Sequence, residues 1–337
     1  MIAAAIGASV ALSSVTAFAD TPVLATDPGG PGLIDVEGHQ LYLDCRGAGS
    51  PTVVFDADLD EGAVSWELVQ PAIAATTRAC AYDRAGVGLS ERGPDPRTSQ
   101  QAVNELHALL VSAGVPPPFI LVGHGFGGLN SQLYAHLYPQ EVVGLVLVDA
   151  THEEWYNQLR GTLPIWVRDL YIRQLASNAE GMNLVVSTLQ VRTAAPRPAV
   201  PTTVITHGYG NVVLPGGSVR VTEDLWTKLQ QDLVQRLPSA TLVVAEQSGH
   251  AIARDQPDLV VRAIEQVRDE ADARSNARDR PQSWLLPFVV SLIALAAGLG
   301  VYVGWQRTHA PVDGEPRLLL GLRNGLRERQ VTRQAPR

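Results

Sequence analysis

The sequence predicts an α/β fold in which helices cover both faces of a mostly parallel sheet. Apolar runs of four to seven residues alternate with stretches of helical character, among them residues 98–113, 128–137 and 256–270. This alternation is typical of parallel strands joined by crossover helices. The composition fits one globular domain of about 250 residues, which is large enough to bury its own core.

Each strand is predicted by an apolar run that ends at turn residues. In chain order the runs are PTVVFDA (51–57), ACAYDRAGVGLS (79–90), FILVGH (119–124), GLVLVDATHEE (144–154), TTVITHG (202–208) and ATLVVAEQSGH (240–250). A further run, LYLDCRG, precedes them and contains Cys45. Residues 150–200 interrupt the alternation with a segment rich in Trp, Leu and Ile.

A glycine-lined turn follows the run 119–124. Residues 123–127 read Gly-His-Gly-Phe-Gly, in the strand–turn–helix context of the G-x-S-x-G nucleophile elbow. Gly125 stands where that motif has its catalytic serine. Because glycine carries no heteroatom, no acyl-enzyme can form there. The sequence therefore predicts the turn without its nucleophile.

The order of these strands, the elbow and a late Ser-Gly-His resembles the α/β-hydrolase fold of serine esterases and lipases from Pro51 to about Arg268. The resemblance implies an eight-stranded, mostly parallel sheet, built from residues 33–149 and 201–270, with a small helical cap at 150–200. It also implies that His250 is the general base. No cofactor is expected, and no metal, because no Cys/His cluster has ligand spacing.

The acid that would pair with His250 is less regular. Many relatives carry it after the strand that ends at Thr206, but residues 207–211 contain no Asp or Glu. Asp149, at the end of the preceding strand, is the expected acid, with Glu153 behind it. The alternative is that Asp149 caps the next helix.

The expected oxyanion donors are the backbone N–H groups of Phe126 and Leu59. Phe126 follows the elbow residue, and Leu59 lies in the loop 57–62, where the family places its second donor. That loop carries three carboxylates, Asp58, Asp60 and Glu61, which would oppose a developing negative charge. Two parts of the esterase machinery are thus altered, which favours loss of esterase activity.

Both ends of the chain carry apolar segments. Residues 1–19 end in Ala-Phe-Ala, a signal-peptidase pattern that lacks a basic n-region, and 20–32 form a Pro/Gly linker. Residues 283–305 hold no charge and exceed the ~20 residues that span a bilayer. We expect a stalk at 271–282, a transmembrane helix at 283–305 and a basic cytoplasmic tail at 306–337. A buried core helix is the alternative for 1–19, and a buried soluble helix for 283–305.

Cysteine content and charge agree with export. The resemblance places Cys45 and Cys80 on neighbouring strands, so one disulfide is expected, with two free thiols as the alternative. The net charge of −8 argues against a nucleic-acid partner. Lys228 is the only lysine, which is typical of a GC-rich, bacterial genome.

The expected function is that of an exported protein anchored in the cell membrane, with its domain on the extracytoplasmic side. Without a nucleophile at Gly125, it would bind a small apolar ligand or a protein partner. The alternative is a weak or atypical hydrolase of an ester or related substrate, in which His250 activates water.

Overall fold

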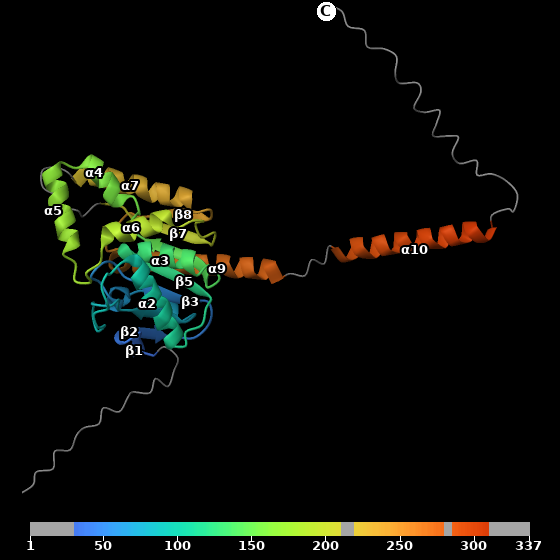
Figure 1. The fold of residues 1–337 in the computed structure, drawn as a ribbon, viewed down its shortest axis with the longest axis horizontal. Helices are drawn as coiled ribbons and strands as arrows, with labels where there is room; N and C mark the ends of the chain where they lie inside the picture. The colour runs from blue at the N-terminus through green and yellow to red at the C-terminus, as the bar shows by residue number, and fades with distance from the viewer. Residues whose placement is uncertain (1–29, 210–218, 280–284, 310–337) are drawn as a thin grey trace, which may run out of the picture. The chain divides into compact units, whose positions relative to one another are not determined.

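The computed structural model describes residues 30–209, 219–279 and 285–309. Its strands are β1 (Gly32–Val36), β2 (His39–Arg46), β3 (Thr52–Asp56), β4 (Ala79–Tyr82), β5 (Phe119–His124), β6 (Val142–Val148), β7 (Thr202–His207) and β8 (Ala240–Ala245). They form one eight-stranded sheet in the order β1-β2-β4-β3-β5-β6-β7-β8 (Figure 1). β1, β2 and β4 pair antiparallel, and all pairs from β4 to β8 are parallel. The predicted sheet is confirmed.

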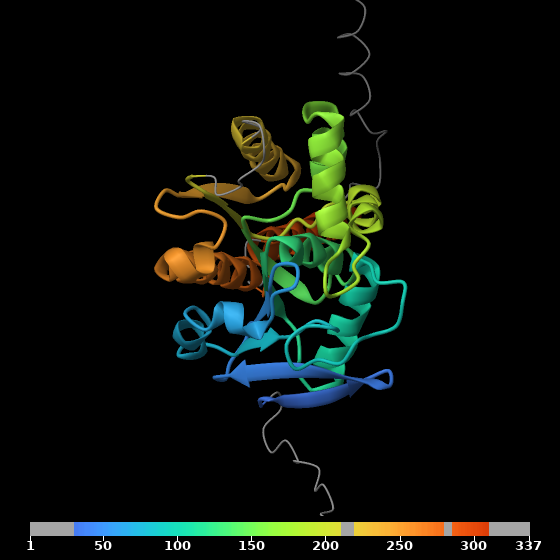
Figure 2. The same ribbon diagram turned by 90° about the vertical axis from the view of Figure 1, so that its left-hand side faces the viewer.

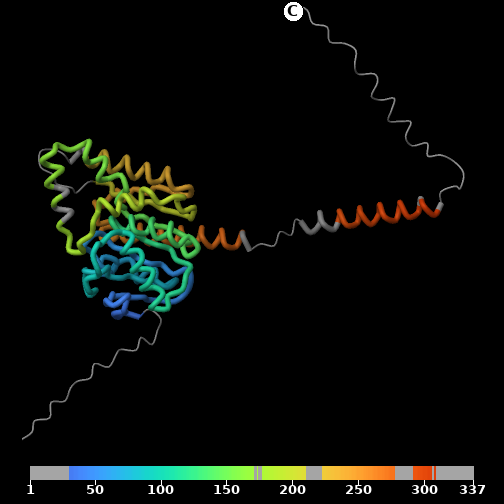
Figure 3. The backbone as a smooth tube through the Cα atoms, in the orientation of Figure 1, coloured from blue at the N-terminus to red at the C-terminus, as the bar shows by residue number. Residues whose placement is uncertain are grey.

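The helices of the described residues connect and cover these strands. They are η1 (Ala63–Trp66), α1 (Gln70–Ala74), α2 (Ser99–Ser112), α3 (Phe126–Leu137), α4 (Trp155–Thr162), α5 (Ile165–Ala176), α6 (Leu184–Thr193), α7 (Val219–Arg236), α8 (Ile252–Asp255), α9 (Pro257–Asp279) and α10 (Leu285–His309). Figure 3 traces the chain through them. The helices predicted at 98–113, 128–137 and 256–270 correspond to α2, α3 and α9, and α9 continues nine residues further, into the expected stalk.

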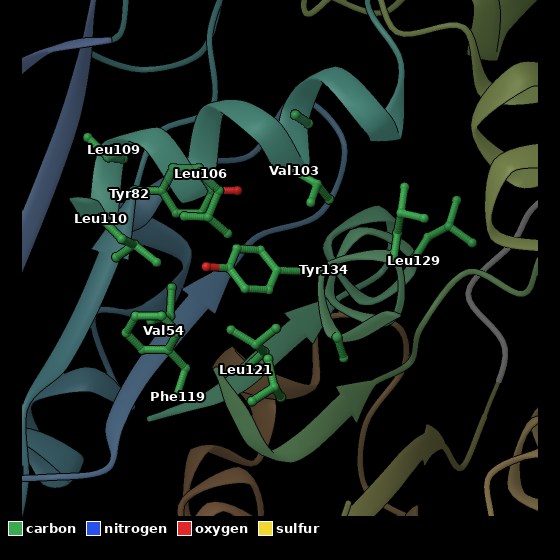
Figure 4. Packing of buried hydrophobic residues seen from close by; sticks show 14 of the residues in the cluster. Val54, Tyr82, Val103, Leu106, Leu109, Leu110, Phe119, Leu121, Leu129 and Tyr134 are labelled. Carbon is green, nitrogen blue, oxygen red and sulfur yellow. The ribbon is translucent and has the colours of Figure 1, made fainter. Parts of the chain in front are cut away.

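The core has two halves because side chains alternate across a strand. Val54 and Leu121 face the cluster beneath α2 and α3, whereas Val53 and Phe55 face the cluster beneath α1 and α9. Figure 2 shows α2 and the start of α9 on opposite sides of the sheet, and Figure 4 shows the α2–α3 half with Tyr134 at its centre. Both faces of the central parallel strands, such as β3 and β5, are therefore buried, as a parallel sheet requires.

Three helices fall within the expected cap, residues 150–200. They are α4, α5 and α6. A fourth helix, α7, joins them, because Trp155 and Leu159 of α4 pack against Trp226 and Leu229 of α7. The two tryptophan rings meet edge to face at 5.0 Å between centroids. The cap over the carboxyl ends of the strands is thus built from two separate segments of the chain, α4–α6 and α7.

One disulfide links Cys45 to Cys80. The two residues are direct register partners of the antiparallel strands β2 and β4. The disulfide prediction is confirmed, and the alternative of two free thiols is wrong.

The predicted end segments lie mostly outside the described residues. This holds for the signal peptide 1–19, for residues 20–29 of the linker, for 280–284 and for 310–337. β1 already starts at Gly32, the last residue of the expected linker. Most of the predicted span falls in α10, yet within the described residues no helix has the length and apolar character needed to cross a membrane, so the predicted transmembrane helix finds no support there.

Candidate functional site

The turn between β5 and α3 has the geometry of a nucleophile elbow. Gly125 has φ +51°, in the left-handed region that side chains disfavour. Its N–H donates to the carbonyl of Val148 at 3.1 Å, and its carbonyl accepts the N–H groups of Gly128 and Thr151. A non-glycine residue held in such a turn costs about 1–3 kcal/mol. Glycine relieves this strain and at the same time removes the nucleophile.

The carboxylate of Asp58 occupies the space that a side chain at position 125 would fill. A Cβ built on Gly125 would overlap the Asp58 carboxyl group. Its Oδ1 accepts the backbone N–H of Phe126 at 2.6 Å, and its Oδ2 accepts Nε2 of His250 at 2.9 Å. An oxygen on residue 125 would use these same two groups, the donor after the elbow and the base. Asp58 therefore satisfies both and leaves neither for a substrate.

Asp149 binds the other ring nitrogen of His250. Nδ1 of His250 donates to Oδ2 of Asp149 at 2.6 Å. Asp149 has φ +42°, a strained conformation for a residue with a side chain, and its backbone N–H donates to the carbonyl of Ile205. The alternative role as a helix cap is wrong, since α4 starts at Trp155 with Glu154 as its cap residue.

A second histidine shares Asp149. Nδ1 of His207 donates to Oδ2 of Asp149 at 2.7 Å, and its Nε2 donates to Glu223 at 2.8 Å. Nε1 of Trp226 donates to the other oxygen of Asp149 at 2.8 Å. The groups form a row of alternating charge, Glu223–His207–Asp149–His250–Asp58, which crosses the carboxyl ends of β3, β6 and β7.

Contacts within the row favour the charged forms of its two histidines and two aspartates. Burial opposes charge on His250, but its bonds to Asp149 and Asp58 outweigh burial and raise its pKa well above 6.5. Burial likewise opposes ionisation of Asp58, but the bond to His250 and the nearby His124 hold its pKa well below 3.8. The side chain of His250 is 41% exposed, so solvent screens part of this attraction. His250 is thus an imidazolium with both N–H groups directed at carboxylates.

A buried arginine fixes the loop that presents Asp58. Arg84 donates to the backbone carbonyls of Ala57 and Asp58 at 2.6 and 2.5 Å. It also forms ion pairs with Asp56 and with Glu180, which lies between α5 and α6, at 2.5 and 2.6 Å. All three charged side chains are at most 3% exposed. The loop 57–62 is therefore fixed by Arg84, which binds its carbonyls, and by Glu180 of the cap, which accepts the N–H of Asp60.

The three carboxylates of residues 57–62 do not act together, which corrects the expectation that all of them flank the oxyanion site. Asp60 faces the cap, where its Oδ1 accepts the N–H groups of Ala179 and Glu180 at 2.7 and 3.2 Å. Glu61 accepts the hydroxyl of Ser65 and lies 3.6 Å from Nδ1 of His124. Only Asp58 enters the space beside Gly125.

A pocket of about 280 Å³ opens above this row. Its base is charged and its walls are mainly apolar and aromatic. The lining residues are Asp58, Leu59, Phe126, Asp149, Thr151, Trp155, Tyr156, Leu184, His207, Thr222, Glu223, Trp226 and His250.

The structure brings together most of the residues that the sequence singles out. Gly125, Phe126, His250 and Asp149 meet at one end of the sheet, and Leu59 lines the pocket beside them. Glu153 does not join them, because its carboxylate pairs with Arg197 and Arg236.

Sequence reasoning missed His207 and Trp226. His207 directly follows a predicted strand at the end where such sites form, and this position was its only signal. Trp226 had none, since it arrives on α7, a helix beyond the segment expected to form the cap.

Two curated proteins are similar to this chain in sequence. The uncharacterized protein YqjL of Bacillus subtilis is 24% identical over 69% of this chain and 89% of its own length. An AB hydrolase superfamily protein of Gibberella zeae is 29% identical over 44% of this chain; the match spans 46% of that relative, less than half its length.

Among solved structures, a thermophilic esterase from Thermogutta terrifontis superposes with a TM-score of 0.52 at 18% identity. The match covers 72% of this chain and 99% of the esterase. The sequence profile described as "Alpha/beta hydrolase family" matches residues 45–263, more than half of the chain. With its sheet, elbow and histidine in the places described above, the chain belongs to the alpha/beta hydrolase family.

Proposed function

We propose that this protein is a ligand-binding member of its family that does not act as a serine esterase. The observation that carries the proposal is the carboxylate of Asp58, which fills the nucleophile position and takes both the Phe126 N–H and His250. An acyl-enzyme needs an oxygen on residue 125 and free oxyanion donors. Residue 125 carries no such oxygen, and the Phe126 donor is occupied by Asp58.

The position of His250 argues against the alternative in which it activates water. A general base needs a lone pair on the nitrogen that faces the substrate. Both ring nitrogens of His250 instead donate to carboxylates, and the raised pKa keeps the ring protonated at neutral pH. Water activation would require Asp58 to leave its place, and the contacts from Arg84 to the backbone of its loop oppose that movement.

The pocket supports a small apolar ligand. Its volume of about 280 Å³ lies just below the range for small-molecule sites, roughly 300–1,000 Å³. Trp155, Trp226, Phe126 and Leu184 supply apolar surface, while Asp58 closes the base. Such walls favour a compact apolar molecule, whose polar group would meet the charged row.

Export and membrane anchoring belong to the same proposal and rest on the sequence. The uncharged run 283–305 and the signal-like residues 1–19 support them. The Cys45–Cys80 disulfide adds support, because such bonds persist mainly in oxidising compartments. The domain would then face the extracytoplasmic side of the cell membrane.

Two measurements on the purified protein test the function. We expect no labelling by a fluorophosphonate, and we expect hexanol to change the tryptophan fluorescence, since Trp155 and Trp226 line the pocket. Leu184→Trp, which fills the pocket, should abolish the hexanol response. Rapid hydrolysis of p-nitrophenyl esters by the unmodified protein, lost in His250→Ala, would contradict the proposal.

A further inference from the structure

A set of metal-ligating side chains meets at the base of the pocket. Among the described residues, Asp58, His124 and His250 each offer one ligand atom, and these atoms all lie within 4.8 Å of one another. Imidazole nitrogen and carboxylate oxygen are ligands that zinc and neighbouring transition metals accept. We infer that these three residues bind a divalent transition-metal ion, for which Zn²⁺ is the reference.

Each of the three side chains is oriented through an atom that the metal would not use. Nδ1 of His250 is held by Asp149 at 2.6 Å, and Nε2 of His124 by the backbone carbonyl of His250 at 2.8 Å. Oδ1 of Asp58 is held by the N–H of Phe126 at 2.6 Å. Ligating histidines in metal sites are fixed in this way by a carboxylate or carbonyl on the second nitrogen.

The remaining atoms are the ones that would face the ion. Because Nε2 of His124 is bonded to a carbonyl, Nδ1 is the nitrogen that would face the ion, and any proton on it would leave to solvent when the ion binds. Nε2 of His250 and Oδ2 of Asp58 lie 2.9 Å apart and share one proton. Metal binding replaces that proton, which leaves to solvent, so the nitrogen and the oxygen both become ligands.

Glu61 lies beside the set but outside it, and its carboxylate would have to move toward the ion to serve as a fourth ligand. Its Oε2 lies 3.6 Å from Nδ1 of His124, and its side chain is 46% exposed. With Asp58 it would supply two negative charges to balance a divalent ion. Asp58 and His250 also line the pocket, so a fifth position would be open toward a ligand there.

This inference is independent of the proposed function, because neither pocket binding nor the lack of esterase activity requires an ion. Sequence spacing gave no sign of it. The ligands lie on the loop after β3, at the end of β5 and after β8, and only the sheet order brings these three strand ends together.

The test uses the full chain, stripped with EDTA and dialysed into metal-free buffer at about pH 8, where imidazole competes less with protons. We expect it to bind about one Zn²⁺ per chain by equilibrium dialysis with mass spectrometry. Co²⁺ in its place should give the visible absorption of a low-coordinate site. His124→Gln and Asp58→Asn should weaken zinc binding at least tenfold.

His107→Gln is the matched control for binding at other histidines, because His107 lies on α2 outside the set. It should leave the affinity unchanged. Circular dichroism checks that each variant folds. If His124→Gln does not fold, the exposed Glu61→Gln decides, with a weaker affinity and a smaller zinc-induced rise in Tm than the unmodified protein. The inference fails if zinc does not bind stoichiometrically, or if it binds equally to the unmodified protein and to the ligand variants.

Discussion

Gly125 and Asp58 depend on each other for their positions. The carboxylate of Asp58 fits beside the elbow only because residue 125 has no Cβ. In return it accepts the N–H of Phe126 and pairs with the imidazolium of His250. The two residues therefore act as one substitution, and changing only one of them should not restore an esterase.

This pairing yields a prediction for engineered nucleophiles. Gly125→Ser alone should destabilise the fold by about 1–3 kcal/mol and remain unlabelled by fluorophosphonate, because its side chain meets Asp58 in a strained turn. Gly125→Ser with Asp58→Gly should become labelled, because His250 and the Phe126 N–H are released. Gel fluorescence measures the labelling.

Removing one oxyanion donor from an esterase lowers kcat by about 10²–10³. Because the double variant regains the Phe126 donor, its kcat for ester hydrolysis should exceed that of Gly125→Ser by a factor approaching ~10². Adding His250→Ala to the double variant is the control and should remove the labelling. Equal labelling of the single and double variants would show that Asp58 does not block the site.

At the scale of elements, the loop 57–62 and the cap are joined by buried charges. Glu180 receives two bonds from Arg84 and one from the backbone N–H of Asp60, and Asp60 bonds back to Ala179 and Glu180. Breaking a buried ion pair is far more damaging than breaking an exposed one, since it leaves a charge without a partner.

Glu180→Ala should therefore lower the free energy of unfolding by about 3–5 kcal/mol. Asp95→Ala is the matched control, because its pair with Arg92 is 3.6 Å long and both side chains are over 60% exposed. Its effect should stay within about 0.5 kcal/mol. Urea unfolding measures both, and similar losses in the two variants would show that the buried bonds of Glu180 do not stabilise the link between the loop and the cap.

His207 joins β7 to α7 and gives the fold a pH dependence. Burial disfavours its charge, but Asp149 and Glu223 outweigh burial and raise its pKa above 6.5. A group whose pKa is higher in the folded state stabilises most below its unfolded pKa, and this contribution disappears as pH rises through the folded pKa.

The loss of Tm on His207→Gln should thus be larger at pH 6 than at pH 9.5. Thermal melts of both proteins at the two pH values measure the difference. His136→Gln is the control and should leave Tm nearly unchanged at both values. A loss for His207→Gln that is independent of pH would mean that packing, rather than charge, is what this residue contributes.

At the scale of the whole molecule, we propose that the apolar segments near the two ends of the chain determine where the domain is located. The uncharged run 283–305 lies between the domain and an Arg-rich C-terminal tail. If it anchors the protein as proposed, protease added to intact cells should degrade the domain and spare the tail.

Immunoblots with one antibody against the domain and one against the tail measure how much of each part survives the protease. Permeabilised cells are the control and should lose both. Protection of the domain together with loss of the tail would reverse the proposed orientation, and protection of both would argue against exposure of either.

The sequence by itself determined the strands, the elbow turn and the glycine at its nucleophile position, because each is encoded locally in an apolar run or a turn motif. The disulfide partners also needed the strand order that the family resemblance implied, since Cys45 and Cys80 are 35 residues apart. Asp149 could also be proposed, because it follows a strand that ends at the same edge as the elbow.

Only the tertiary structure decided which carboxylate enters the site and what it does there. The three carboxylates of the loop 57–62 cannot be told apart from the sequence. The way each side chain points depends on contacts of the loop with Arg84, Glu180 and the cap, which lie far away in sequence. The row from Glu223 to Asp58 also needs α7 folded over β7. Such contacts arise from packing between distant segments, and no short pattern along the chain encodes them.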